Sequence, residues 1–367
     1  MRALVVGGTG PTGPYIVRGL LKRGYEVTLF HRGTHESDEI PACVEHIHGD
    51  PHFRETIEAS LVGREFDLVL ATYGRLRHLS SVLRGRTNRF IGIGGVAVYR
   101  GYKEPERLFP QGMLVPTRES DSRVEDDEEV RFSRLMSESE DAVFTDHPGA
   151  TLFRYPYVYG PNQLIPREWC VIRRVLDHRS HIIVPEGGLM LATHGYAENL
   201  AHAVLLAVDQ PQAAAGQAYN CGDEMTMTVR QLIEVIAQAM GATLKIVSVP
   251  NEVAIASRAL TMREDLHHWV MDISKLQREL GYHDLVHPVT AVRETVMWYL
   301  QNPPERGGEI EQRLADPFDY EIEDRVIAAQ ATALDELHRA IAGVTTTRRP
   351  HAYAHPRQPG ERDHRAR

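Results

Sequence analysis

Residues 4–13 read LVVGGTGPTG and join a short apolar run to an amphipathic segment over Tyr15–Leu21. This order is typical of a strand, a glycine-rich turn and a helix. Gly7 lets the chain turn sharply, Gly10 lets a pyrophosphate approach the backbone, and Gly13 lets the helix pack closely on the strand. The free N–H groups at the start of the helix favour an anion. The stretch predicts a dinucleotide site, with a tight turn of no further role as the alternative. The predicted contacts in this turn are Gly7, Thr9, Gly10, Pro11, Thr12 and Gly13.

The first 100 residues alternate between β-rich runs and helical stretches. Strands are predicted over 2–7, 26–31, 44–48, 67–72 and 89–94, and helices over 15–23, 53–61 and 76–84. Further strands are predicted over 150–155 and 217–221, and further helices over 130–144 and 197–208. The alternation predicts an α/β fold with a doubly wound parallel Rossmann sheet covered on both faces.

Two lobes are predicted to be interleaved along the chain. Residues 1–165 and 190–224 form the dinucleotide-binding domain, and residues 166–189 and 225–305 form a smaller substrate lobe. Residues 306–344 are predicted to be a helical extension. Residues 345–367 hold six arginines and three prolines with little apolar content, which predicts a disordered basic tail.

The composition narrows the class of protein. Of the 367 residues, 42% are hydrophobic and 25% are charged, as in ordinary globular proteins. No apolar run approaches 18 residues and no secretory signal is visible, so we expect a cytoplasmic protein without a membrane partner. The net charge of −9 makes nucleic acid an unfavourable partner. Three widely spaced cysteines fit reduced thiols.

The 19 histidines are scattered along the chain. His46 and His48 alternate on a predicted strand, and His267 and His268 are adjacent. Neither pair has a third ligand nearby in the sequence, as a zinc site requires. We therefore predict no metal.

The end of the second predicted strand decides which dinucleotide fits. An NAD site usually has an acidic residue there for the ribose 2′-hydroxyl. This strand ends in His31 and Arg32, and an arginine can pair with the 2′-phosphate of NADP. NADP is therefore predicted over NAD, with a solvated loop arginine as the alternative. Asp50, after the third strand, either accepts a hydrogen bond from the adenine amino group or only forms a turn before Pro51.

Several motifs in order resemble the extended short-chain dehydrogenases/reductases of the NAD-dependent epimerase/dehydratase type. They lie at residues 7–13, 90–99, 154–161, 198–201, 218–220 and 274–282, within about residues 1–302. The resemblance implies that Ala71, Thr72 and Tyr73 line the nicotinamide ribose. It also implies that Tyr155, Pro156 and Tyr157 lie beside the nicotinamide and the substrate.

The catalytic pattern that the resemblance implies is broken in this chain. The family uses a Ser or Thr after the fifth strand and a Tyr-x-x-x-Lys on the next helix, in which tyrosine is the acid/base. Gly95 stands at the serine position, Val130 at the tyrosine position and Arg134 at the lysine position. Arg134 can still hold a ribose or a phosphate, because its charge and donors persist.

Another group must then move the proton in an enzyme. Tyr102 follows the fifth strand, where doubly wound sheets bind ligands. Tyr157 lies in the segment nearest the nicotinamide by the resemblance. His194 has a suitable ordinary pKa for acid/base work. We expect one of these to be catalytic, each with a structural role as its alternative.

Three functions fit this sequence. The first is an NADP(H)-dependent oxidoreductase acting on a small, partly apolar carbonyl or hydroxyl compound. The second is a lyase, dehydratase or isomerase with no net redox change that keeps the nucleotide. The third is a non-enzymatic nucleotide sensor or RNA-binding relative, since relatives resembling chloroplast stem-loop binding proteins also end the second strand in Phe-x-Arg-Gly. By the resemblance, a homodimer would form through the helices over 76–84 and 130–144.

Overall fold

The computed structural model describes residues 1–34, 37–125, 130–261, 266–345 and 355–362. Residues Met1–Phe318 form one compact unit and Asp319–Arg367 a second. In the second unit, helix α13 (Tyr320–Ala340) is capped by Asp319, whose carboxylate accepts the Ile322 N–H at 3.1 Å. The predicted disordered tail falls mostly outside the described residues.

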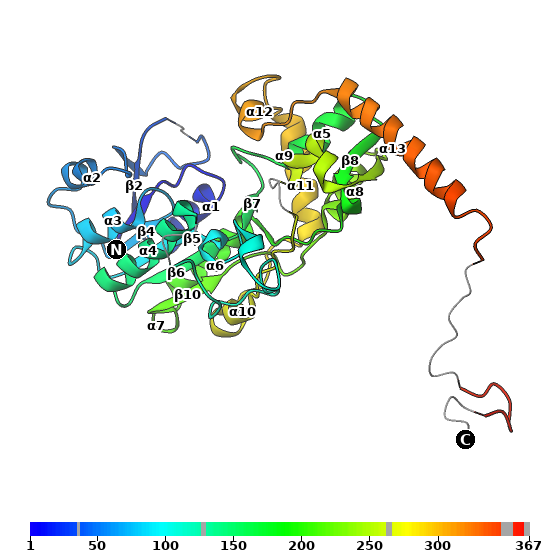
Figure 1. The fold of residues 1–367 in the computed structure, drawn as a ribbon. Coiled ribbons are helices and arrows are strands. Elements are labelled where there is room, and N and C mark those ends of the chain that lie inside the picture. Colours follow the sequence, from blue (N-terminus) through cyan, green and yellow to red (C-terminus); the bar gives the residue numbers. More distant parts are fainter. Residues whose placement is uncertain (35–36, 126–129, 262–265, 346–354, 363–367) are drawn as a thin grey trace. The chain divides into compact units, whose positions relative to one another are not determined.

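A seven-stranded parallel sheet in the order β10-β6-β5-β4-β1-β2-β3 organises the first unit (Figure 1). Each strand agrees with its predicted range to within one residue at either end. This order confirms the predicted doubly wound α/β fold. The strands are β1 (Arg2–Val6), β2 (Glu26–His31), β3 (Glu45–His48), β4 (Leu68–Ala71), β5 (Phe90–Gly95), β6 (Thr151–Tyr155) and β10 (Gln217–Asn220).

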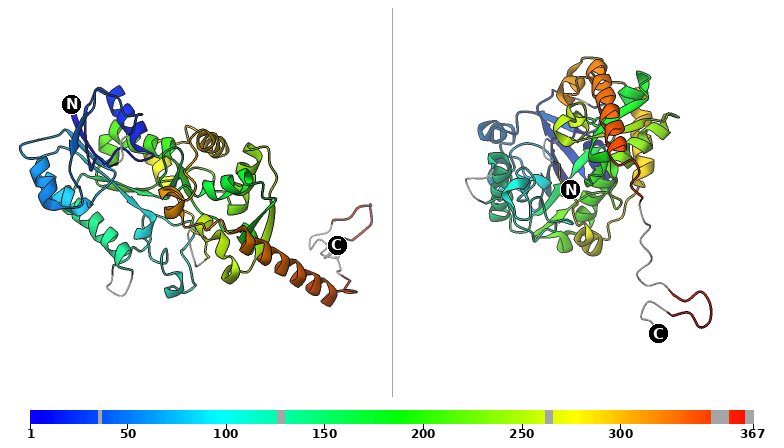
Figure 2. Two further views of the ribbon diagram at one scale, coloured as in Figure 1. Left: turned by 90° about the horizontal axis from the view of Figure 1, so that it is seen from above. Right: turned by 45° about the vertical axis from the view of Figure 1, so that its right-hand side comes forward.

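Helices cover both faces of this sheet (Figure 2). Side chains alternate across a strand, so Val5 packs on one face and Leu4 on the other. Both faces are apolar, as expected for a parallel sheet buried on two sides. Helices α1 (Gly13–Lys22) and α6 (Ala197–Asp209) pack on the Val5 face, and α2 (Arg54–Ser60), α3 (Leu76–Leu83) and α4 (Arg131–Asp146) pack on the Leu4 face.

A smaller lobe is built from chain segments that leave the main sheet and return to it. Strands β8 (His181–Pro185) and β11 (Lys245–Val249) pair in parallel, as do β7 (Tyr157–Tyr159) and β9 (His194–Tyr196). The lobe has its own apolar core, which buries Trp169, Ile233 and Val296. Its helices are α5 (Glu168–Leu176), α8 (Val229–Ala239), α9 (Arg258–Thr261) and α11 (Pro288–Gln301). The remaining helices of the first unit are α7 (Pro211–Ala214), α10 (Ser274–Leu280) and α12 (Glu309–Leu314).

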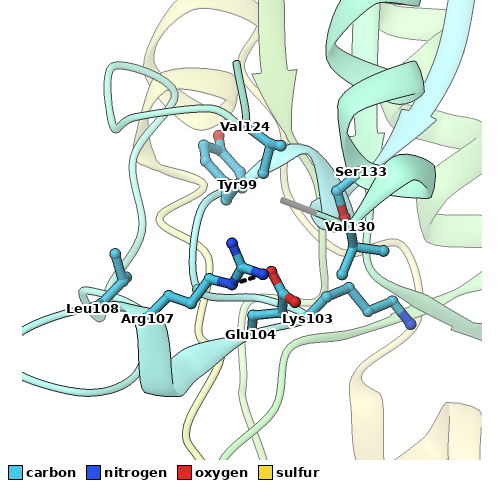
Figure 3. A pocket seen from close by; sticks show the side chains of 9 residues that line it. Tyr99, Lys103, Glu104, Arg107, Leu108, Val124, Val130 and Ser133 are labelled. Atoms are coloured by element: carbon cyan, nitrogen blue, oxygen red, sulfur yellow. Dashed lines mark ion pairs between the residues drawn. The ribbon is translucent and has the colours of Figure 1, made fainter. Parts of the chain in front are cut away.

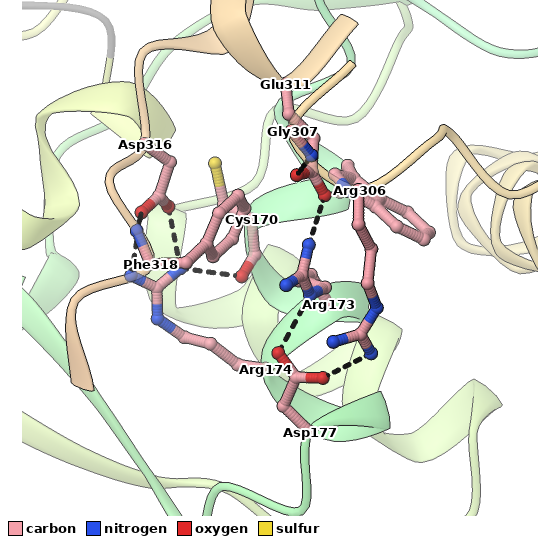
Figure 4. Close-up of polar contacts among 10 residues, drawn as sticks. Cys170, Arg173, Arg174, Asp177, Arg306, Gly307, Glu311, Asp316 and Phe318 are labelled. Atoms are coloured by element: carbon pink, nitrogen blue, oxygen red, sulfur yellow. Dashed lines mark hydrogen bonds and ion pairs between the residues drawn. The ribbon is translucent and has the colours of Figure 1, made fainter.

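Buried ion pairs attach the segment after α11 to helix α5 (Figure 4). Arg174 donates two hydrogen bonds to Asp316, at 2.7 and 3.2 Å, with the two side chains 2% and 0% exposed. Arg173 pairs with both Asp177 and Glu311. The predicted helical extension over 306–344 is therefore divided, since α12 belongs to the first compact unit and α13 to the second.

None of the described helices has the length and apolar character needed to cross a lipid bilayer. Helices α3 and α4, through which the resemblance implies a homodimer, pack against each other in one apolar cluster. The homodimer stays a prediction.

Candidate dinucleotide site

A cavity of about 350 Å³ opens at the carboxyl ends of β1, β2 and β4, where the order of the sheet reverses. Doubly wound sheets bind their ligands at this switch point. The cavity unites the glycine turn with residues that are distant in sequence. Its lining residues are Gly7, Gly8, Thr9, Gly10, Pro11, Thr12, Gly13, His31, Arg32, Gly33, Thr34, Thr72, Tyr73, Ile93, Tyr155, Val158, Asn162, Gln163 and Leu164.

The glycine turn is shaped by close backbone packing. Gly7 has φ +88°, and a Cβ there would lie 2.7 Å from the side chains of Thr72 and Tyr73. A Cβ on Gly13 would lie 2.0 Å from the carbonyl oxygen of Gly8. At Gly10, by contrast, a Cβ would meet nothing within 4 Å. Gly13 therefore serves the close packing of helix on turn, while Gly10 leaves space for a ligand.

Thr72 ties the glycine turn to the end of β4. Its hydroxyl accepts the Gly8 N–H at 3.2 Å and donates to the Val6 carbonyl at 2.8 Å. Tyr73 lines the cavity beside it, whereas Ala71 is fully buried in the strand and contributes no part of the lining. After β4 the described lining therefore begins at Thr72, one residue later than the Ala71 that the resemblance implies.

The end of β2 presents a basic and aromatic wall. The Arg32 guanidinium lies over the Tyr73 ring, 5.4 Å from its centroid. No carboxylate occurs among the described residues that line the cavity. Asp50, predicted to bind the adenine amino group, is not among the residues that line the cavity. Its carboxylate is hydrogen-bonded to the backbone N–H and the ring of His52, at 2.9 and 2.8 Å. Although partial burial acts to raise the pKa of Asp50, these His52 hydrogen bonds outweigh it, so the pKa is lowered.

Tyr155, the last residue of β6, and Val158 form a further part of the cavity wall. Tyr155 is buried, and desolvation raises its pKa well above the ordinary value. Its phenol therefore stays protonated and acts as an apolar wall with one hydrogen-bond donor. Pro156, the neighbouring residue, is buried outside the described lining.

Helix α4 turns an apolar side chain toward the end of β5. A Cβ on Gly95 would lie 3.3 Å from Cε of Met136. Arg134 instead lies near Glu138 on its own helix, with Nε 3.7 Å from the carboxylate, and contributes nothing to the cavity lining. The α4 residue that packs on Gly95 is therefore Met136, and the role predicted for Arg134, to hold a ribose or a phosphate, stays a prediction.

Val130, at the predicted tyrosine position, lines a separate small cavity of about 10 Å³ (Figure 3). Ser133 and Tyr99 also line it, as do Arg107 and Glu104, which form an ion pair at 2.8 Å. This space holds roughly one water molecule. It is too small for a substrate.

Three of the predicted catalytic residues meet in an aromatic cluster at the second lobe. The Tyr157 and His194 rings are 5.6 Å apart, Tyr102 lies 5.7 Å from Trp269, and His194 lies 6.0 Å from Trp269. Arg167 completes this group, with its guanidinium 3.9 Å from the Tyr157 ring centroid. We call Tyr102, Tyr157, Arg167, His194 and Trp269 the aromatic cluster. None of its members lines the dinucleotide cavity, but Tyr157 precedes Val158, which does.

Burial sets the protonation states around the aromatic cluster. Desolvation lowers the pKa of His194 to about 3, and the charge of Arg167 acts in the same direction. His194 is therefore neutral at neutral pH, which disfavours it as a proton donor. Desolvation raises the pKa of Glu168 to about 7, against the lowering effects of its own backbone N–H and of Arg167. Tyr157, whose hydroxyl lies 3.5 Å from the Glu168 carboxylate, also has a pKa raised by burial.

Arg167 and Glu168 were not predicted as site residues. Both are buried, at 5% and 1% exposed. The Nε of Arg167 and the Nε1 of Trp269 have no hydrogen-bond partner among the described residues, which is unusual for buried donors. In the sequence, the adjacent charges of Arg167 and Glu168 at the start of an apolar helix were the available signal of a site. Only the fold shows that both side chains lie against Tyr157.

Comparisons with known proteins agree with this architecture. No family model matches the chain. The chloroplast stem-loop binding protein of 41 kDa b of Arabidopsis thaliana is 26% identical over 255 residues, which cover 65% of this chain and 63% of that protein. UDP-D-apiose/UDP-D-xylose synthase 2 of the same plant is 26% identical over 137 residues, which cover 35% and 34%. The matches thus span less than two thirds of these relatives.

Solved structures match over more of the chain. UDP-glucose 4-epimerase from Thermotoga maritima has a TM-score of 0.66 at 17% identity, covering 83% of this chain and all of that one. The dTDP-glucose 4,6-dehydratase of Bacillus anthracis, solved with NAD, has a TM-score of 0.62 at 16% identity, covering 82% and 97%. At these identities the likeness establishes the fold.

Proposed function

Because this chain has the extended short-chain dehydrogenase/reductase fold of the NAD-dependent epimerases and dehydratases, as its motifs predict, we propose that it is an NADP(H)-dependent oxidoreductase. Its substrate is a small, partly apolar carbonyl or hydroxyl compound. The observation that carries the proposal is the cavity that joins the glycine turn to Arg32, Thr72 and Tyr155. The space over Gly10 fits a pyrophosphate at the start of α1.

The choice of NADP rests on Arg32. A 2′-phosphate would gain charge-assisted hydrogen bonds from its guanidinium, and the described lining offers no carboxylate to repel that phosphate. Several of the similar solved structures, at least five of them, hold NAD. Comparing the two dinucleotides on the same protein is therefore the sharpest test of cofactor choice.

Replacing Arg32 with Ala is expected to raise the Kd for NADP by about 10-fold or more and to change the Kd for NAD by less than about 2-fold. The lost charge-assisted bonds are worth roughly 1.5–3 kcal/mol. Isothermal titration of both dinucleotides measures this difference. Arg278→Ala, an exposed arginine on α10, is the matched control. An equal loss for NAD and NADP would contradict the proposal.

We infer that the acid/base group has moved to Tyr157. Gly95 and Val130 stand at the serine and tyrosine positions that the resemblance implies, and neither can exchange a proton. Tyr157 keeps its proton at neutral pH. Its hydroxyl accepts the Arg167 backbone N–H at 2.9 Å and donates to the Ile165 carbonyl at 2.8 Å, a bond that the substrate oxygen would replace. When bound, NADPH supplies the hydride. Tyr157 would give its proton to the substrate oxygen, and Glu168 would replace that proton.

The buried donors of Arg167 and Trp269 would orient the substrate. A substrate oxygen that accepts from Arg167 Nε or Trp269 Nε1 would satisfy groups that otherwise lack a partner among the described residues. Tyr102 and His194 would form the apolar wall around that oxygen. Turnover of NADPH with a panel of carbonyl compounds tests the whole proposal, and cofactor binding without turnover on every class would count against it.

In such a turnover assay, Tyr157→Phe should lower kcat by about 100-fold, because it removes the transferable proton and keeps the ring. Glu168→Gln should remove the fall in reduction rate expected above about pH 7, where the Glu168 carboxyl loses its proton. Tyr25→Phe, at the opposite end of β2 from the cavity, is the control. A wild-type pH profile for Glu168→Gln would contradict the role of this carboxyl.

A second candidate function follows from the similarity to the stem-loop binding protein. If this chain binds RNA, the net charge of −9 requires a local basic surface. Filter binding of a structured RNA at low and physiological salt, with and without NADP, separates this function from the oxidoreductase. Product formed from substrate with only catalytic NADP would instead indicate a redox-neutral lyase, dehydratase or isomerase.

A further inference from the structure

We propose that His31, His46 and His48 form a binding site for a transition metal ion of the Zn²⁺ class at the wall of the dinucleotide cavity. Among the described residues these three offer ligand nitrogens that all lie within 4.8 Å of one another. Three imidazoles with an open fourth position are a known zinc coordination set.

The sheet itself brings the three rings together. Strands β2 and β3 are parallel neighbours, with Leu29 opposite His46 and His31 opposite His48. Residues two apart on a strand point to the same face, so His46 and His48 share a face. Because register partners on paired strands also share a face, His31 projects beside them.

The distances between the rings fit closure around one ion. Nε2 of His31 lies 2.9 Å from Nδ1 of His46, and the His31 ring centroid lies 5.1 Å from that of His48. Zinc–nitrogen bonds of 2.0–2.1 Å in a tetrahedron place ligand nitrogens roughly 3.3 Å apart. The 2.9 Å contact must open by a few tenths of an ångström, and the longer separations must close by side-chain rotation.

The three histidines differ in burial, in a way that would let an ion enter from solvent and still be held by a buried ligand. His31 is buried, His46 is half-buried and His48 is exposed, so an ion reaches the site from the solvent side. Water or a phosphate oxygen can then fill the fourth position. In the structure Nδ1 of His31 accepts the Gly33 N–H at 3.2 Å. Coordination of a metal through Nε2 would move the ring proton to Nδ1. Metal binding therefore replaces both this bond and the contact between His31 and His46.

The prediction of no metal from the sequence considered only neighbouring positions. His46 and His48 lack a third ligand in sequence, but His31 lies on the adjacent strand, 15 residues from His46. Because His31 also lines the cavity beside Arg32, a bound ion would add positive charge at that end. This effect on the cofactor rests on the proposed function, whereas the metal site does not.

Titration of the full-length, dinucleotide-free protein with Zn²⁺ and with Co²⁺ tests the site. We expect one tight equivalent per chain, and cobalt d–d bands of tetrahedral intensity. His46→Ala and His48→Ala should each weaken Zn²⁺ binding by about 100-fold, since each removes one of three ligands. His48 is exposed, so its variant is expected to stay folded, as circular dichroism will verify.

His338→Ala, an exposed histidine on α13, is the matched control and should bind Zn²⁺ like the wild type. Equal Zn²⁺ affinities in the wild type and His48→Ala would overturn the proposal, because the retained binding would lie elsewhere. Octahedral cobalt spectra with only weak binding would also overturn it, leaving a hydrogen-bonded histidine cluster. Neither readout uses a dinucleotide, so failure here leaves the proposed cofactor site untouched.

Discussion

Gly10→Ala is expected to weaken NADP binding by about 100-fold while leaving the melting temperature of the ligand-free protein unchanged. A Cβ at Gly10 meets no protein atom within 4 Å, so the free protein accommodates it. The same methyl group would hold a pyrophosphate away from the N–H groups at the start of α1. Losing one or two charge-assisted bonds, each worth about 1.5–3 kcal/mol, gives a loss of this size. Isothermal titration and thermal unfolding measure the two effects.

Two further glycine variants distinguish a loss of space for the ligand from a loss of packing within the protein. Gly13→Ala would place a Cβ 2.0 Å from the Gly8 carbonyl oxygen, so both binding and the melting temperature should fall. Gly149→Ala, between α4 and β6, also meets nothing within 4 Å and should change neither quantity. Wild-type NADP affinity in Gly10→Ala would show that the pyrophosphate does not lie on this turn.

Asp316→Ala is expected to lower the free energy of unfolding by about 3–5 kcal/mol. Asp316 and Arg174 are almost fully buried, and the variant leaves the Arg174 guanidinium without its carboxylate in the interior (Figure 4). An uncompensated buried charge costs this much, whereas an exposed ion pair contributes less than about 1 kcal/mol. Urea unfolding monitored by circular dichroism gives the difference directly.

The exposed pair between Arg313 and Glu309, on the neighbouring helix α12, supplies the control. Arg313→Ala should change the free energy of unfolding by less than about 0.5 kcal/mol. If Asp316→Ala proved as mild as Arg313→Ala, the segment after α11 would not be anchored to α5 through this pair.

The sheet could be predicted because local sequence determines it. Several strands, such as β1 and β4, are short apolar runs between turn residues, the pattern expected of parallel strands buried on both faces. Strand β3, with the sequence EHIH, departs from this pattern. The short strands β7, β8 and β9 were not predicted. Strands β7 and β9 carry tyrosines, a histidine and a glycine, whereas β8 holds the apolar residues Ile182, Ile183 and Val184. All three pair with strands far along the chain.

The candidate site was less predictable where packing decides it. Arg134 fits the family spacing by sequence, but it is absent from the described lining of the cavity, and Met136 is the α4 residue that packs on Gly95. Arg167 and Glu168 gained their altered pKa values only from burial, which a linear sequence does not reveal.

The strand order has a consequence for synthesis on the ribosome. Strand β6 ends at Tyr155, but its outer neighbour β10 begins at Gln217, after part of the smaller lobe. While the intervening chain emerges, the outer edge of β6 has no strand beside it. Unpaired edges invite association with other chains. The interleaved order therefore makes the nascent chain vulnerable to aggregation until residue 220 has emerged from the ribosome and the sheet is complete.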